Sequence, residues 1–133
     1  MLLKSRRQIF SGGIDNKIRC WDLRLAQEAA MAEVGAAEPE PVFELVGHAD
    51  TITGISLSPD GTQLLSNSMD STARVWDVRP FVAGGDEARC TTVLAGHQHN
   101  FEKLLLKASW SPDGVQQSLS TTPPVYLTRG WIF

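Results

Sequence analysis

The sequence predicts an all-β fold built from a repeated unit of antiparallel strands. Two segments align without gaps and share six identities in sixteen positions, Ile9–Arg24 (IFSGGIDNKIRCWDLR) and Leu64–Arg79 (LLSNSMDSTARVWDVR). In each, an Asp lies six residues before a Trp-Asp pair, between short runs of the kind that form strands. Further short motifs recur around these segments: Gly47-His48 and Gly96-His97, and Ser-Pro-Asp-Gly at Ser58–Gly61 and Ser111–Gly114. This self-similarity indicates a repeat architecture.

The complete copy of the unit spans Gly47–Asp77, where His48 and Trp76 are 28 residues apart. A recurring unit that runs from Gly-His to Trp-Asp is the signature of a WD-repeat β-propeller, whose blades take roughly 40–45 residues each. Closed rings need about 4–8 blades of four strands, so a chain of 133 residues has too little length to close one. We therefore predict a propeller fragment, an open arc of roughly two to three four-stranded antiparallel blades, and expect a truncated product or an incomplete gene model.

The predicted organisation has five segments, one of which is a loop rich in Ala, Glu and Pro. A short helix over residues 25–34 is the alternative for that loop, and the lack of a clear apolar stripe disfavours it. In chain order the segments are a partial blade (1–24, beginning with a basic lead-in), the inserted loop (25–41), the central blade region with the outer strand of the preceding blade (42–95), the start of a further blade (96–114) and a divergent tail (115–133).

Within the central region, turn chemistry separates the expected strands. Pro59 fixes its φ angle and Gly61 permits positive φ, so Pro59-Asp60-Gly61 is a turn signal. A second loop contains Pro80 and Gly84-Gly85. The expected strands are residues 42–46, 51–58, 62–67, 72–78 and 90–95, the first belonging to the preceding blade.

Four side chains of the repeat are expected to meet: His48, Ser66, Asp70 and Trp76. Antiparallel strands place their turns at alternate ends, so the loop with His48 and the turn with Asp70 fall at one end. The Asp can accept a hydrogen bond from one imidazole nitrogen, and the Ser hydroxyl can bond to the other nitrogen. The indole N–H lies in reach of the same Ser, so all four polar groups are paired. We predict a structural tetrad. Asp15, Trp21 and His97 hold the corresponding positions in the partial repeats.

A Ser, a His and an Asp in contact also describe a nucleophilic triad. We favour the structural role because the residues recur with the repeat, and no G-x-S-x-G turn is present. The sequence also lacks a G-x-x-x-x-G-K-[ST] phosphate loop and an H-E-x-x-H metal motif, and no third ligand accompanies His97 and His99. We therefore predict no enzyme activity, no catalytic or metal-binding residues, no cofactor and no small-molecule substrate.

The amino-acid composition limits the kinds of binding partner and the cellular compartment that we expect. The chain has 15 acidic against 12 basic residues, which argues against nonspecific nucleic-acid binding and leaves RNA contact indirect at most. Cys20 and Cys90 lack the spacing of a disulfide framework or zinc site, which favours a reducing compartment. Lys4 follows Met1-Leu2-Leu3 at once, so we expect no signal peptide, and no apolar run approaches the roughly 18 residues of a membrane span.

Beyond the generic repeat, residues 47–114 resemble the WD-repeat subunit of the spliceosomal U-five small nuclear ribonucleoprotein. The runs WDVRPF (Trp76–Phe81) and HNFEK (His99–Lys103) carry this resemblance, and residues 9–24 fit the preceding repeat. It covers about Gln8–Gly114. It implies a noncatalytic propeller scaffold that docks on the large central protein of the U-five particle and takes part in pre-mRNA splicing in the nucleus.

Two alternatives stay open: another WD-repeat adaptor, such as a substrate receptor of a ubiquitin ligase, or a nonfunctional fragment. The two runs named above disfavour the other adaptor, because generic propellers do not need those side chains. The loop Gln98–Lys103 is the best candidate for a partner contact, since His99, Phe101 and Glu102 place an aromatic ring among polar groups. Phe101 packed under the loop as local core is an equal alternative.

Overall fold

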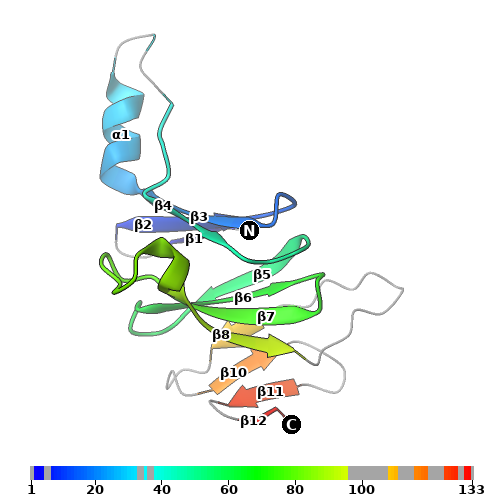
Figure 1. Ribbon diagram of the computed structural model, residues 1–133. Coiled ribbons are helices and arrows are strands. Elements are labelled where there is room, and N and C mark those ends of the chain that lie inside the picture. The colour runs from blue at the N-terminus through cyan, green and yellow to red at the C-terminus, as the bar shows by residue number, and fades with distance from the viewer. Residues whose placement is uncertain are drawn as a thin grey trace.

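The computed structural model describes residues 2–4, 7–32, 35, 38–95, 108–110, 116–119, 125–128 and 131–132. The strands in these ranges form three four-stranded antiparallel sheets, with one α-helix, α1, standing away from them (Figure 1). This confirms the predicted fold class, an open set of antiparallel sheets with little helix. The first sheet consists of β1 (Leu2–Lys4), β2 (Gln8–Gly12), β3 (Lys17–Asp22) and β4 (Phe43–Val46). The second consists of β5 (Ile52–Leu57), β6 (Gln63–Ser68), β7 (Thr72–Asp77) and β8 (Cys90–Ala95), and the third of β9 (Ala108–Trp110), β10 (Gln116–Leu119), β11 (Val125–Thr128) and β12 (Trp131–Ile132).

Each sheet is a meander in which every strand pairs with the next one along the chain. The two aligned sequence segments fold as the same hairpin: Trp21 faces Ile9 across β3 and β2, and Trp76 faces Leu64 across β7 and β6. The turns match as well, because Asn16 and Ser71 hold corresponding positions and both have positive φ, 65° and 63°. The repeat seen in the sequence is therefore a repeat of backbone conformation.

The second sheet lies between the other two (Figure 1). Its face toward the first sheet joins a buried apolar cluster made of Phe10, Ile18, Cys20, Phe43, Leu45, Ile52, Ile55, Leu64, Trp76 and Val78. Its opposite face buries Leu65, Ala73 and Val75, against which Trp110 of the third sheet packs. The Trp110 indole N–H also donates to the Ser56 carbonyl oxygen at 3.0 Å. Each fully buried apolar side chain of these two clusters contributes about 1.5–3 kcal/mol, so burial between the sheets stabilises the stack.

Two segments differ from the sequence-based expectation at the N-terminal side. The basic lead-in contains β1, which with β4 completes a four-stranded first sheet. The inserted segment is in part helical, which agrees with the short-helix alternative, although α1 spans Leu23–Met31 and so begins two residues earlier than expected. The Asp22 side chain caps this helix by accepting from the Arg24 amide at 2.8 Å. None of its residues is fully buried, but Leu23, Ala26 and Ala29 are partly buried along one side, so capping and the helix propensity of its Ala, Leu, Glu and Gln residues add to a narrow apolar stripe.

The tail also differs from the expectation. Residues 115–133 were expected to diverge from the repeat, yet β10, β11 and β12 lie within them and complete the third sheet with β9. Strand pairing uses backbone N–H and C=O groups, so a strand forms without the motif side chains that mark the other two sheets. The run Val125–Thr128 is rich in β-branched and aromatic residues, which favour strands.

Candidate functional site

The structure brings the four predicted side chains of the tetrad together in the second sheet. The Trp76 indole N–H lies 2.8 Å from the Ser66 hydroxyl oxygen, which lies 2.7 Å from His48 Nε2. On its other side His48 Nδ1 lies 2.9 Å from Asp70 Oδ2. Ser66 and Trp76 come from β6 and β7, Asp70 from the turn between them, and His48 from the segment before β5. The residues thus form one continuous hydrogen-bonded chain.

The chemistry of the two ends sets the direction of the two outer bonds. An indole N–H only donates and an ionised carboxylate only accepts, so Trp76 donates to Ser66 and His48 Nδ1–H donates to Asp70. In the neutral tautomer that carries its proton on Nδ1, the Ser66 hydroxyl donates to Nε2. This assignment leaves each of these donors and acceptors paired, as buried polar groups require.

Asp70 receives further hydrogen bonds within its turn. The Ala49 amide donates at 2.9 Å, and Thr72 donates through its amide at 2.8 Å and its hydroxyl at 2.7 Å. Burial alone raises the pKa of the Asp70 carboxyl, but the bonds from Thr72, Ala49 and His48 outweigh burial and hold this pKa well below its ordinary value. Asp70 is therefore a fixed anion that orients the imidazole.

The glycine before His48 has a steric role. A Cβ atom at Gly47 would lie 2.8 Å from Arg74 Nη1 and 3.1 Å from Trp76 Cη2. The flexible end of Arg74 can move away, but the buried Trp76 ring would have to shift by a few tenths of an ångström, so glycine suits this position. The edge of the His48 ring meets that of Trp76 as well, with ring centroids 6.1 Å apart at 62°. The Gly-His pair thus closes one side of the tetrad.

The first sheet contains the Trp–Ser hydrogen bond of this arrangement but not its Asp–His pair. Trp21 donates to the Ser11 hydroxyl at 2.8 Å, as Trp76 does to Ser66. Asp15, the counterpart of Asp70, instead pairs with Arg19 at 2.5 Å, and Arg19 also binds Glu44 at 2.9 Å. The hydrogen bond from Arg19 lowers the pKa of Asp15. The remaining predicted residues, His97, His99, Phe101 and Glu102, lie outside the described residues.

The tetrad is closed to solvent. Ser66 has 0% of its surface exposed and its hydroxyl is bonded on both sides. A nucleophile needs a route to its substrate, and in the described part of the chain this hydroxyl is covered and engaged by Trp76 and His48. Among the residues that the structure describes, no group of three or more His, Cys, Asp and Glu side chains is arranged to hold a metal ion. Within the same residues, no helix combines the length and apolar character of a membrane span.

Sequence reasoning missed Arg89, a buried residue that ends the 3-10 helix η1 (Asp86–Arg89), directly before β8. Its Nη1 donates to the carbonyl oxygens of Arg79 and Asp77 at 2.7 and 3.3 Å, and its Nε to Asp86 at 2.6 Å. The guanidinium also stacks 3.9 Å above the Phe43 ring of the first sheet. One arginine thus ties the loop after β7 to the neighbouring sheet. An isolated Arg in a Gly-rich loop carries no sequence signal of burial.

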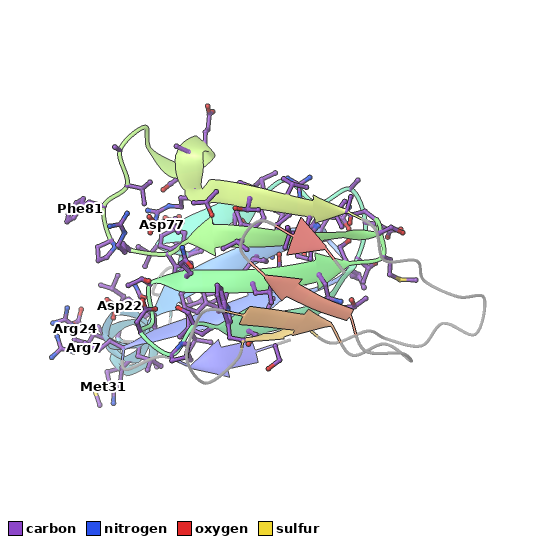
Figure 2. The ribbon with its side chains drawn as sticks, turned by 90° about the horizontal axis from the view of Figure 1, so that it is seen from below. Arg7, Asp22, Arg24, Met31, Asp77 and Phe81 are labelled. Atoms are coloured by element: carbon purple, nitrogen blue, oxygen red, sulfur yellow. The ribbon has the colours of Figure 1, made fainter. Side chains whose placement is uncertain are left out.

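The loop end of the second sheet presents a polar hollow of about 230 Å³, lined by Thr62, Gln63, Asp77 and Arg79. Asp77 accepts from Arg79 Nε at 3.0 Å and from Nη2 at 2.5 Å. These hydrogen bonds lower the pKa of Asp77. Figure 2 shows this end of the sheets, where Phe81, Arg24, Arg7 and Met31 project outward.

Comparison with known proteins identifies the repeat. Residues 39–77 match the family model described as WD domain, G-beta repeat. The chain is 50% identical over 72 residues to the U5 small nuclear ribonucleoprotein 40 kDa protein of Homo sapiens, and equally so to that of Mus musculus. This confirms the resemblance predicted from the sequence. The chain is also 38% identical over 90 residues to the DDB1- and CUL4-associated factor 11 homolog of Caenorhabditis elegans.

These matches are partial. The aligned region covers 54% of this chain but 19% of the human U5 protein, and 67% of this chain but 14% of the nematode protein. The chain therefore spans about a fifth or less of the length of the curated relatives it matches.

Proposed function

We propose that this chain is a noncatalytic protein-binding scaffold that takes part in pre-mRNA splicing in the nucleus, as a component of the U5 particle. The observation that carries this proposal is the 50% identity over 72 residues to a protein named as part of the U5 small nuclear ribonucleoprotein. The proposal includes the protein partner inferred from the resemblance, the large central protein of that particle.

The geometry of the tetrad supports a structural role in place of catalysis. The Ser66 hydroxyl is buried and bonded on both sides, and His48 is held between Ser66 and Asp70. Each bond contributes about 0.5–1.5 kcal/mol net, whereas leaving a buried partner unpaired costs about 1–3 kcal/mol. The four residues stabilise the blade, and the loops of that blade supply the proposed binding surface.

Contact with RNA is proposed to be indirect. The net charge of the chain is −3, and a direct binder of phosphate backbones carries a basic patch or stripe. We keep His99, Phe101 and Glu102 as a proposed partner contact, because an aromatic side chain among polar groups is a common interface anchor. These residues come from the HNFEK run that carries the resemblance.

The proposal is tested by expressing the tagged chain in cells and measuring U5 RNA in the purified material. We expect enrichment of U5 RNA over another spliceosomal RNA of equal abundance. The double variant Phe101→Ala, Glu102→Ala should lose most of this enrichment at unchanged protein level. Ile14→Ala, a change at an exposed apolar residue, is the matched control. Wild-type chain without U5 enrichment would overturn the splicing role, and a double variant with full enrichment would remove this loop as the contact.

A second candidate is a ubiquitin-ligase adaptor. It is favoured by the 38% identity to a protein named as a DDB1- and CUL4-associated factor, which extends over 67% of this chain. The same purification discriminates the two functions. Recovery of DDB1 and CUL4 without U5 RNA would support the adaptor and exclude the splicing scaffold.

A further inference from the structure

The first sheet has an outer face, which points away from the second sheet. Its inner face contributes Phe10, Ile18 and Cys20 to the buried cluster that the two sheets share. Successive side chains of a strand point to opposite faces of a sheet. Figure 1 shows the first sheet at one end of the stack, so none of the described sheets covers its outer face. On β2 and β3 this uncovered face carries Ile9, Ser11 and Trp21.

The internal repeat shows what covers the equivalent face of the second sheet. Trp21 and Ile9 align with Trp76 and Leu64, which belong to the cluster shared with the first sheet. Under that cover Trp76 is 2% and Leu64 0% exposed, whereas Trp21 and Ile9 are both partly exposed. The two hairpins have the same cross-strand pairing and the same indole-to-serine hydrogen bond. The outer face of the first sheet therefore carries the residues that, in the second sheet, receive another four-stranded sheet.

The sheets also stack in a constant direction. Leu57 of β5 and Trp110 of β9 hold equivalent positions, since each stands directly before a Ser-Pro-Asp-Gly sequence. Leu57 packs against the cluster shared with the first sheet, and Trp110 packs against the cluster around Leu65 on the far face of the second sheet. Each sheet thus turns this position towards the sheet before it. A stack with one direction ends in two different faces, and each is the kind of face that the other receives.

The charged groups of the outer face are already paired with one another. Towards the turn between β2 and β3, Arg19 binds Asp15 at 2.5 Å and Glu44 at 2.9 Å, and Lys17 binds the second carboxylate oxygen of Glu44 at 2.9 Å. These four side chains are 29–44% exposed and border the apolar part of the face. A polar group that is buried without a partner costs more than one hydrogen bond contributes. A sheet docked over the apolar part keeps these ion pairs intact and avoids that cost.

We propose that two copies of this chain pair head to tail, each docking its third sheet on the outer face of the other copy's first sheet. The third sheet is a four-stranded antiparallel meander like the first, which is the element that the repeat places on this face. Two copies supply six sheets, and closed rings of such blades contain about 4–8. A closed pair covers both open ends of each copy, whereas head-to-tail contacts that do not close extend into filaments. The helix α1 rises on the same side of the first sheet (Figure 1), so it flanks the docked sheet.

The test measures the mass of the full chain in solution by size-exclusion chromatography with light scattering, at low micromolar concentration. We expect one species with twice the mass of the chain. Ile9→Asp places a carboxylate in the apolar part of the face and should shift the chain to the monomer mass at the same concentration. Phe81→Asp makes the same chemical change at a loop residue that is 93% exposed. It lies in the loop after β7 of the second sheet, so it is the matched control and should stay paired.

A photoreactive benzoylphenylalanine in place of Ile9 identifies the docked surface, and it decides the question where Ile9→Asp does not fold. In a mixture of isotopically light and heavy copies we expect cross-links between copies, to β10, β11 or β12. A monomeric wild type, filaments in place of a closed pair, or an Ile9→Asp variant that folds and stays paired would each overturn the proposal. Cross-links confined to β4 and β8 would overturn it in favour of pairing between strand edges. A monomer that still enriches U5 RNA would reject the pairing and leave the proposed scaffold function standing.

Discussion

The cost of the substitution Ser66→Ala in folding stability follows directly from the hydrogen bonds of Ser66. In Ser66→Ala the buried Trp76 indole N–H loses its acceptor, at a cost of about 1–3 kcal/mol, and the bond to His48 is lost, at about 0.5–1.5 kcal/mol more. We therefore expect the free energy of unfolding to fall by about 2–4 kcal/mol. This is a large part of the stability of a typical domain, which is about 5–15 kcal/mol.

The repeat supplies a control for this change. Ser11 has the corresponding position in the first sheet, accepts from Trp21 alone within the described ranges, and is partly exposed. Ser11→Ala should cost about 0.5–1.5 kcal/mol. Pulse proteolysis in increasing urea, at submicromolar protein, measures both costs without relying on tryptophan fluorescence. In a Trp76→Phe background no indole N–H remains to be left unpaired, so Ser66→Ala should then cost about 1–2 kcal/mol less. Equal costs for the two serines, or strict additivity of Ser66→Ala and Trp76→Phe, would refute the idea that Ser66 links the tetrad.

Three further predictions concern Asp70, the cysteines and self-association. Because the folded pKa of Asp70 is depressed, its contribution to stability is complete above the unfolded value of about 3.9 and is lost as the pH falls through the folded pKa. Asp70→Asn should make the urea midpoint less dependent on pH between about pH 5 and 2.5, and an unchanged pH dependence would argue against this carboxylate. Burial raises the pKa of the Cys20 thiol to about 12. Iodoacetamide at about pH 8 should therefore label the partly exposed Cys90 and reach Cys20 only on unfolding. Equal labelling of the two cysteines in the folded chain, measured by mass spectrometry, would contradict the burial of Cys20. The isolated chain should self-associate, because in the described ranges the outer edges of β4 and β8 have no partner strand and Val46 and Val93 are exposed on them. Light scattering that finds a soluble monomer with a sharp thermal transition would contradict this.

Local sequence patterns predicted much of the fold because each works over a few residues. Strand alternation and the turn at Pro59–Gly61 located β5 to β8 within one or two residues at each end. The tetrad followed from the same information, since a hairpin with a short turn sets which side chains face each other across it. The expectation that His48 lies near Asp70 needed no tertiary contact. In a meander, strand order alone decides at which end of the sheet each loop and turn lies.

The sequence could not predict features that depend on distant surfaces. Arg89 is buried because the Phe43 ring of another sheet lies beneath it and two carbonyl oxygens face it, and all three come together only when the sheets pack. The helix α1 and the strands of residues 115–133 lacked the motif side chains by which the repeat was recognised. Capping and backbone pairing, which need few specific residues, form them.

By itself the sequence determined the repeat, the strand order, the all-β class and the residues of the tetrad. Those features are encoded in spacing, which folding preserves within a hairpin. Only the tertiary structure decided which faces of the sheets are buried against each other, that Arg89 joins two sheets, and that Phe81 is exposed. The physical reason is that burial and exposure depend on which distant segment covers a side chain, and spacing along the chain does not carry that information.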